Sequence, residues 1–335
     1  RRVSEDLADG GAVSSAPLFR IGADYAGKTT ELKAGSFLVP QGASMSEIVD
    51  IVTRGGASTC GTEVVYRVSI ARATVQVREL DPATGRFAEV AAFNPAEDAV
   101  PDAYTQVKAE PDTRYRVALA EGVTSWQIVN ELNQIDILEG EVTETPAEGS
   151  LAPDSYEISP GDSRASLIER MTQAQDQILA EAWANRQDGL PYDSPEEALI
   201  MASIIEKETG TPDERFLVSS VLVNRLRQGM RLQTDPTVIY GITRGEGVLG
   251  RGIRQSELRA ETPWNTYVIP GLPPTPIANP GRASIEAALN PDETPYIFFV
   301  AKTLNPADGH NFAVTLAEHN ENVAAYRALE AQRDN

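Results

Sequence analysis

The chain has 335 residues, and its 29 Lys and Arg against 49 Asp and Glu give a formal net charge of −20. This length predicts two or three domains with a real hydrophobic core, and 41% hydrophobic residues is typical of a globular protein. The acidic balance argues against a nucleic-acid partner or an anionic membrane surface. A single cysteine, Cys60, excludes an internal disulfide and a multi-cysteine metal site. The sequence contains no run of about 18 apolar residues, so it predicts no membrane span.

The amino-terminal part is predicted to contain two small strand–helix units around a β-rich insert. Residues 1–30 are weakly patterned, and we expect a frayed or partly ordered lead-in. Over residues 31–138, a strand near Leu32 and a helix from Ser46 form the first unit, and a strand from Tyr115 and a helix capped by Thr124 form the second. The insert covers about residues 59–113 and includes a β-hairpin.

The rest of the chain is predicted to be mainly helical. Residues 139–188 comprise a junction rich in Glu, Pro, Gly and Ser over residues 139–163 and a long helix from about Ser163 to Arg186. Residues 189–335 contain the densest motifs, and we expect the chemistry there. The fold class predicted for the whole chain is α+β.

One helix in this last region carries a carboxylate on its apolar side. Ser194-Pro195-Glu196-Glu197 is a capping box that starts a helix, and Gly210 is a natural stop. At about 100° per residue, Glu208 falls on the same face as the preceding apolar residues, whereas Glu206 lies to the side and Lys207 on the polar side. An apolar setting and the negative end of the helix dipole both raise a carboxyl pKa, as a general acid requires. On spacing alone, a structural role for Glu208, for instance a pair with Arg225, is the commoner outcome.

The following segments supply polar candidates for binding. Asn224 lies on the next helix, close to the first through a short turn. Gln233, Thr234 and Asp235 are consecutive, and Asp235 is also suited to cap a helix that begins at Pro236. Asn265 and Tyr267 precede the proline-rich run 271–281, which, with Trp264, forms either one wall of a sugar-binding groove or a structural crossover.

The two histidines do not indicate a metal site. His310 is predicted at a turn into a strand and His319 on a helix, and neither has a second His or Cys at ligand spacing. There is also no Gly-x-Ser-x-Gly elbow and no glycine-rich phosphate loop. We therefore predict no cofactor.

Several separate motifs together resemble the YceG-like endolytic murein transglycosylases. They are Met201-Ala202-Ser203-Ile204-Ile205-Glu206-Lys207-Glu208-Thr209, Val223-Asn224-Arg225-Leu226, Met230 to Gly241, Asn265-Thr266-Tyr267 with Gly271-Leu272-Pro273-Pro274, and Gly309-His310-Asn311-Phe312. The resemblance spans about residues 189–326 in the family's order, and it favours a catalytic Glu208 over the structural role.

The resemblance implies cleavage of the β-1,4 bond between N-acetylmuramic acid and N-acetylglucosamine within glycan strands, without water. Glu208 is then the acid and base, and Asn224, Gln233, Thr234, Asp235, Asn265 and Tyr267 are candidates to orient the substrate. Arg225 and Arg231 are candidates to bind carboxylates of the stem peptides, and a solvated surface position is the commoner role for Arg231. Two alternatives stay open: a muramidase-type hydrolase with a second carboxylate, and a peptidoglycan-binding scaffold without catalysis.

The resemblance also implies a setting for the protein. Lys33-Ala34-Gly35-Ser36 and Leu119-Ala120-Glu121-Gly122, each with its following helix, look like two halves of a LysM-like region. Family members have an amino-terminal membrane anchor, which we expect upstream of Arg1. We therefore expect the periplasmic face of the bacterial inner membrane, peptidoglycan strands as substrate and cell-wall synthases as partners.

Overall fold

The computed structural model describes residues 2–9, 11–29, 37, 39–40, 42–53, 61–81, 84, 86–110 and 113–333. The chain divides into two compact units. The first comprises residues 1–65 and 75–116, and the second comprises residues 66–74 and 117–335. The boundaries predicted at residues 138 and 188 both lie inside the second unit and stay predictions.

The first unit begins with three helices, α1 (Arg2–Asp9), α2 (Ala16–Tyr25) and α3 (Met45–Thr53). The segment predicted as a frayed or partly ordered lead-in contains α1 and α2, and Phe19 and Ala23 of α2 are buried in one cluster with Ile48, Val49 and Val52 of α3. The apolar residues of α2 are too few to give a strong pattern in the sequence. The residues that they pack against, on α3, lie about 25 positions later in the chain. The motif Lys33-Ala34-Gly35-Ser36 lies outside the described residues, so the LysM-like prediction for this half stays a prediction.

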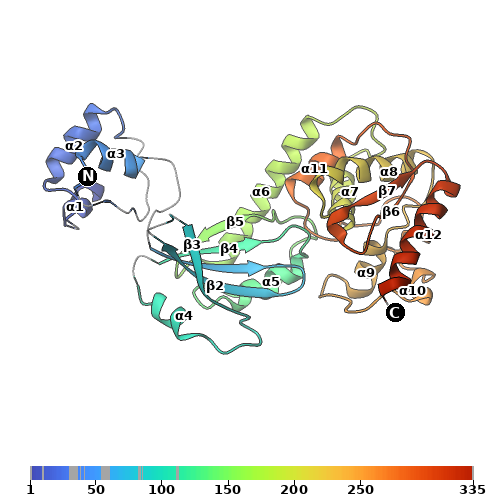
Figure 1. Cartoon of the computed structure of the whole chain (residues 1–335), viewed down its shortest axis with the longest axis horizontal. Coiled ribbons are helices and arrows are strands. Elements are labelled where there is room, and N and C mark those ends of the chain that lie inside the picture. Colours follow the sequence, from blue (N-terminus) through green and yellow to red (C-terminus); the bar gives the residue numbers. More distant parts are fainter. Residues whose placement is uncertain are drawn as a thin grey trace. The chain divides into compact units, whose positions relative to one another are not determined.

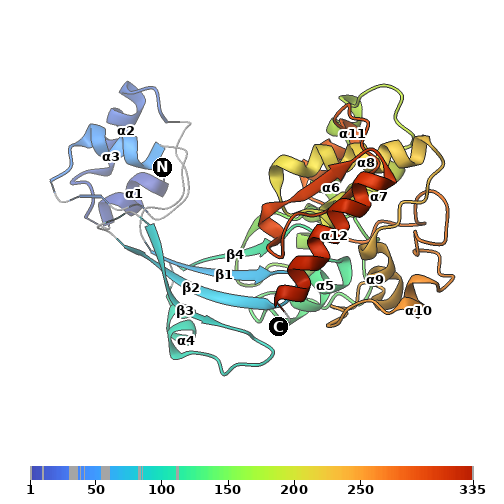
Figure 2. The same cartoon turned by 45° about the vertical axis from the view of Figure 1, so that its right-hand side comes forward.

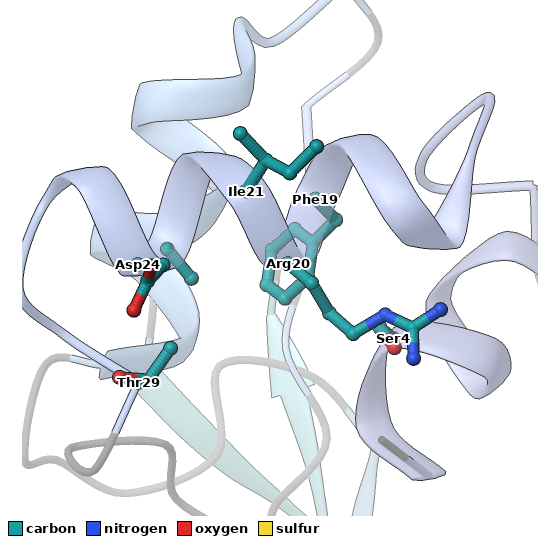
Figure 3. A pocket seen from close by; sticks show the side chains of 7 residues that line it. Ser4, Phe19, Arg20, Ile21, Asp24 and Thr29 are labelled. Carbon is teal, nitrogen blue, oxygen red and sulfur yellow. The ribbon is translucent and has the colours of Figure 1, made fainter.

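A hollow of about 400 Å³ lies beside α2 and is lined by residues of the first unit (Figure 3). Phe19 forms its buried side and is 1% exposed, whereas Ile21 is 65% exposed. Both come from α2, so the helix presents apolar side chains to the core and to the surface.

The predicted β-rich insert is confirmed for the described residues. It contains β1 (Thr62–Val68), β2 (Ala73–Asp81), β3 (Arg86–Phe93) and α4 (Asp102–Val107). The predicted hairpin is the antiparallel pair β2–β3, with Val75 opposite Phe93 and Asp81 opposite Arg86. With β4 (Arg114–Leu119) and β5 (Ser155–Ile158), the strand order is β3-β2-β1-β4-β5 (Figure 1).

The second unit includes the predicted strand–helix step from β4 to α5 (Ser125–Gln134), which Thr124 caps by accepting from the Gln127 N–H. The junction is ordered and includes β5, and the long helix is confirmed as α6 (Arg164–Ala184). Asn279 ties these parts to the carboxyl-terminal region, since its Nδ2 donates to the Val123 carbonyl at 3.1 Å and its Oδ1 accepts from the Leu151 N–H at 2.9 Å.

The main core of the second unit surrounds α7 (Pro195–Glu208), which contacts α6, α8, α9 and α11 (Figure 1). Its buried residues include Met201, Ile204 and Ile205, all 0% exposed. The elements that follow α7 along the chain are η1 (Pro212–Glu214), α8 (Arg215–Arg227), α9 (Asp235–Thr243), α10 (Gln255–Leu258) and α11 (Arg282–Leu289).

The chain then forms β6 (Phe298–Ala301), η2 (Pro306–Asp308), β7 (His310–Ala313) and α12 (Leu316–Arg333). Strands β6 and β7 pair antiparallel, and α12 contacts both of them (Figure 2). None of the helices formed by described residues combines the length and the apolar character that crossing a bilayer requires.

Candidate active site around Glu208

Helix α7 places Glu208 as its last residue. The helix starts as predicted, because Ser194 Oγ accepts from the Glu197 N–H at 3.3 Å and Pro195 occupies the first turn. It ends where Thr209 adopts an extended conformation before Gly210. Residues 201–205 of the helix are buried, and residues 206–208, which include Glu208, are partly buried. Among the described residues, no side chain or backbone group forms a hydrogen bond or ion pair with its carboxyl group.

The surroundings of Glu208 favour its protonated form. Burial, followed by the negative charge of Asp235, raises its pKa from 4.5 to about 8, although Arg225 opposes the shift. Burial raises a carboxyl pKa because the ionised form loses hydration, and a like charge adds repulsion. At neutral pH the Glu208 carboxyl group therefore carries its proton, which is the state of a general acid.

Asp235 does not cap a helix, contrary to the capping role considered for it. It is the first residue of α9, where Thr234 is the cap residue and no side-chain cap bond forms. The Asp235 side chain is free for another contact, and its Oδ1 accepts the hydroxyl proton of Tyr267 at 2.7 Å. Burial, the hydrogen bond to Asp235 and the nearby Glu208 raise the pKa of Tyr267. The structure thus brings Glu208, Asp235, Tyr267 and Arg225 together.

Three predicted substrate-orienting residues make hydrogen bonds to neighbouring protein groups, and their role in binding stays a prediction. The Asn224 amide donates to the carbonyls of Thr294 and Tyr296 at 2.7 and 2.9 Å. The buried Asn265 amide donates to three carbonyls, the shortest contact being 2.7 Å to Ala260. Thr234 is 3% exposed, and its N–H donates to Thr266 Oγ1 at 3.0 Å. Buried amides and hydroxyl groups need hydrogen-bond partners, and these side chains find them in neighbouring backbone and hydroxyl groups. The contacts therefore fix the backbone around the site.

Gln233 differs from these three, because it is exposed and adopts a left-handed backbone conformation with a φ of 52°. Its N–H donates to the Thr266 carbonyl at 3.2 Å. Left-handed conformations of residues other than glycine cost free energy and occur often at functional sites. The role of Gln233 in binding stays a prediction.

Glu206 and Lys207, predicted to the side and on the polar side of α7, are covered by segments that are distant in sequence. Both are partly buried, with Glu206 Oε2 accepting from the Gly281 N–H at 3.0 Å and Lys207 Nζ donating to the Gly122 carbonyl at 3.1 Å. Burial lowers the pKa of Lys207, and Glu206 and Glu148 oppose that effect. Periodicity gave the angle around α7, but segments distant in sequence cover both sides of the helix. Lys207 also lines a cavity of about 310 Å³ together with Tyr240.

The proline-rich run is a structural crossover in its second half. Residues 276–281 are almost all buried, and the Ile277 N–H donates to Ser203 Oγ of α7 at 3.0 Å. Trp264 Nε1 donates to Thr275 Oγ1 at 3.0 Å, and the guanidinium carbon of Arg244 lies 3.8 Å from the centre of the Trp264 ring. The indole ring is thus occupied by protein contacts.

Comparison with known proteins identifies the family of this chain. Residues 95–325 match the YceG-like family. The chain belongs to this family. It is 36% identical over 181 residues to the endolytic murein transglycosylase of Bacillus subtilis, which covers 54% of this chain and 48% of that protein. It is 30% identical over 186 residues to the endolytic murein transglycosylase of Streptococcus pneumoniae, covering 53% of this chain and 32% of that one.

A solved structure agrees with this assignment. The crystal structure of a yceG-like protein from Listeria monocytogenes is 25% identical and has a TM-score of 0.51, with 95% of this chain and 93% of that one covered. The matches to the two named transglycosylases span about half of their length or less.

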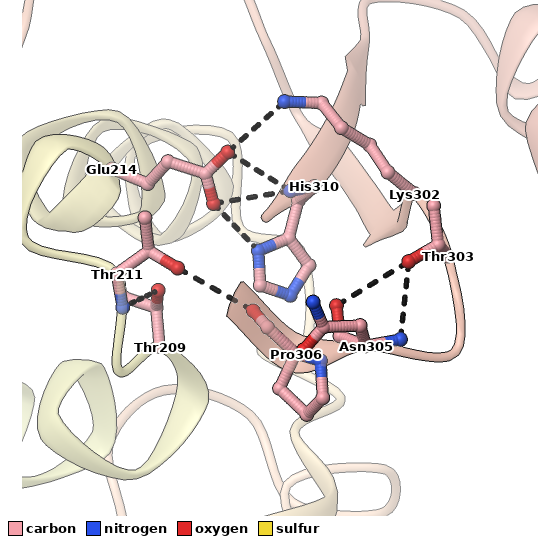
Figure 4. A network of polar contacts seen from close by, with 8 residues as sticks. All are labelled: Thr209, Thr211, Glu214, Lys302, Thr303, Asn305, Pro306 and His310. Atoms are coloured by element: carbon pink, nitrogen blue, oxygen red, sulfur yellow. Dashed lines mark hydrogen bonds and ion pairs between the residues drawn. The ribbon is translucent and has the colours of Figure 1, made fainter. Parts of the chain in front are cut away.

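In this YceG-like chain, Glu214 is a structural carboxylate that sequence reasoning missed (Figure 4). Its two carboxylate oxygens accept from the His310 N–H at 2.9 and 3.1 Å and contact His310 Nδ1 at 2.9 Å, and Lys302 Nζ lies 3.4 Å away. Burial raises the pKa of Glu214, but the contacts with His310 and Lys302 outweigh burial and lower it overall. Gly309 has a φ of 74°, and a Cβ there would lie 2.2 Å from Glu214 Oε1. The Gly309-His310 motif was visible in sequence, but its partner lies about 95 residues earlier.

His310 therefore has a structural partner, as does His319, which stacks on Phe298 with ring centres 5.0 Å apart. Within the described part of the chain, no group of three or more His, Cys, Asp or Glu side chains has the arrangement of a metal site.

Proposed function

We propose that this chain is an endolytic murein transglycosylase with Glu208 as its acid and base. The observation that carries the proposal is the Glu208 carboxyl group at the end of α7, which has a pKa of about 8 and lies near Asp235. Among the described residues it has no hydrogen-bond or ion-pair partner. Membership of the YceG-like family and the names of the Bacillus and Streptococcus relatives support the substrate class.

In the first step, protonated Glu208 donates its proton to the glycosidic oxygen that leaves with N-acetylglucosamine. The bond between that oxygen and C1 of N-acetylmuramic acid breaks, and positive charge develops on the muramyl ring. The negative charge of Asp235 lies close enough to Glu208 to raise its pKa, and in this step it also favours the developing cation.

In the second step, the Glu208 carboxylate removes the proton from the C6 hydroxyl group of the same muramyl residue. The C6 oxygen attacks C1 and closes a 1,6-anhydro ring, which returns Glu208 to its protonated form. No water is consumed. The 2-acetamido group of the substrate stabilises the cationic intermediate, so the mechanism parallels substrate-assisted glycosidases that need a single protein carboxylate.

A hydrolase is the second candidate, because Asp235 is a carboxylate next to Glu208 and is not used as a helix cap. In that reaction Asp235 would activate water or attack C1, and the product would have a reducing end. The Asp235 carboxylate already accepts a hydrogen bond from the Tyr267 hydroxyl group, and the two named relatives are transglycosylases. We therefore favour the transglycosylase.

The test is mass spectrometry of the ends formed from purified glycan strands. We expect 1,6-anhydro ends with the wild-type protein and no cleavage with Glu208→Gln. Glu196→Gln, an exposed position on the same helix, is the matched control and should cleave normally. Reducing ends, together with complete loss of activity in Asp235→Asn, would instead identify a hydrolase. Binding of strands without any cleavage by the wild-type protein would point to a scaffold.

The setting follows from the same proposal. We infer that the chain acts at the periplasmic face of the inner membrane, with an anchor upstream of Arg1 and cell-wall synthases as partners, and that a LysM-like region contributes to glycan binding. Fractionation of cells expressing the full-length protein, followed by crosslinking, tests the location and the partners.

A further inference from the structure

Arg225 is a buried cation beside Glu208 that keeps unused hydrogen-bond donors. It lies on α8 and is 7% exposed. Its Nε donates to the Ile297 carbonyl at 2.7 Å and its Nη1 to the Leu232 carbonyl at 2.5 Å. These two bonds fix the guanidinium plane. In the part of the chain that the structure describes, no carboxylate oxygen lies within 4.0 Å of it.

Arg164 shows how this chain treats a buried arginine that has only a structural role. It is 9% exposed and has no ion pair among the described residues. A guanidinium has five N–H groups, and Arg164 makes five hydrogen bonds to carbonyls. The acceptors are Leu132, Asn133, Ile135, Leu138 and Gly140.

Arg225 makes two such bonds, so three of its five N–H groups have no acceptor among the described residues. Nη2 makes no hydrogen bond to a described residue, and it is not among the side-chain atoms that are fully buried without a partner. It therefore keeps contact with solvent, and its two N–H groups are reachable. A fixed, buried and reachable cation with open donors is the arrangement that a bound anion completes.

The neighbouring groups leave the charge of Arg225 uncompensated. Glu208 is close enough to interact with it electrostatically, but at neutral pH Glu208 is protonated. The guanidinium carbon of Arg225 lies 5.6 Å from the centre of the Phe298 ring, on which His319 stacks. Burial and then Arg225 lower the pKa of His319, so His319 stays neutral and adds no second positive charge.

We propose that Arg225 forms an anion-binding subsite beside Glu208 and that its ligand is a carboxylate carried by the muramyl residue of the substrate. This inference rests on the proposed function, since a muramyl residue bears the carboxylates of a glycan strand. They come either from the lactyl group of a strand without peptides or from the stem peptide. A guanidinium binds a carboxylate through two parallel N–H donors, which would also fix the orientation of the sugar over Glu208.

The first experiment changes the charge of the substrate and leaves the protein intact. One pair of glycans has stem peptides with free or amidated carboxylates, and the other has bare lactyl groups that are free or methyl-esterified. We expect neutralisation to lower kcat/KM by roughly tenfold or more in one of the two pairs, because a charge-assisted hydrogen bond is lost. The pair that responds identifies the source of the carboxylate. Equal kcat/KM within both pairs overturns the proposal.

The second experiment changes the protein. Arg225→Gln should remove the difference between charged and neutral glycans, whereas Arg227→Gln should retain it. Arg227 lies two residues later on the same helix, is exposed and donates to the Gly189 carbonyl, which makes it a matched control. If Arg225→Gln does not fold, the substrate pairs still decide the question with the intact protein.

A binding measurement separates this inference from the proposed function. Calorimetry with Glu208→Gln protein, on which strands stay intact, should give a Kd that is roughly tenfold lower for the charged member than for the neutral member of at least one of the two glycan pairs. That result, with no cleavage by the wild-type protein, would refute the transglycosylase and retain the subsite. Cleavage with equal Kd values would do the reverse.

Discussion

The environment of Glu208 predicts that the residue is costly for stability, and that Glu208→Gln stabilises the protein increasingly as the pH rises. The pKa of Glu208 is raised from 4.5 to about 8 by burial and by Asp235. The folded state therefore binds the proton more tightly than the unfolded state, so stability falls as the pH rises between these two values. Below pH 4.5 the proton is bound in both states and the cost vanishes.

The magnitude follows from the two pKa values. One pKa unit corresponds to about 1.4 kcal/mol, so ionisation of Glu208 in place costs about 5 kcal/mol in full. At pH 7 the unfolded chain is ionised and the folded chain is not, which gives a cost of about 3 kcal/mol. Glu208 keeps some contact with solvent, which screens part of this cost, and we expect a measured gain of about 2 kcal/mol for Glu208→Gln at pH 7.

Urea unfolding followed by tryptophan fluorescence measures this effect. Trp126, Trp183 and Trp264 all belong to the second unit, as Glu208 does, so the signal reports on the unit that changes. The difference in unfolding free energy between Glu208→Gln and the wild-type protein should be close to zero at pH 4 and should grow to pH 8. Glu196→Gln should show no such trend. A difference that stays constant from pH 4 to pH 8 would refute the raised pKa.

Three further predictions concern the neighbours of Glu208 and the scaffold. Asp235→Asn removes a like charge from Glu208, so the alkaline limb of the pH–kcat profile should move to lower pH by about one unit; an unchanged limb would show that Asp235 does not act on Glu208. Arg164→Lys should cost about 3 kcal/mol in urea unfolding, because most of five hydrogen bonds to buried carbonyls are lost, and a cost below about 1 kcal/mol would contradict the anchoring role. Glu214 has a lowered pKa, so its contribution to stability is present above the unfolded value and is lost as the pH falls through the folded one. Glu214→Gln should therefore destabilise the protein at pH 7 and have little effect at pH 2, and an equal loss at both pH values would exclude the charged contact with His310.

The sequence by itself determined the local features of the site. Ser194 and Pro195 start α7, Gly210 stops it, and the helical period places Glu208 beside Ile204 and Ile205. These features depend on residues within about four positions of one another, where capping and periodicity act. The hairpin β2–β3 and the helix α6 were predictable for the same reason.

Only the tertiary structure decided what each polar side chain contacts. Asp235 had a local role available as a cap, yet its carboxylate accepts from Tyr267, 32 residues away. Lys207 was expected on the polar side, but the Gly122 carbonyl, 85 residues earlier, accepts from its Nζ. The sequence does not distinguish the buried residues Arg164 and Arg225. Their guanidinium groups differ in the structure, because five hydrogen bonds to carbonyls are made by Arg164 and two by Arg225. Such contacts join segments that are distant along the chain, and local residue patterns carry no signal for them because the folded backbone sets the distance between the partners.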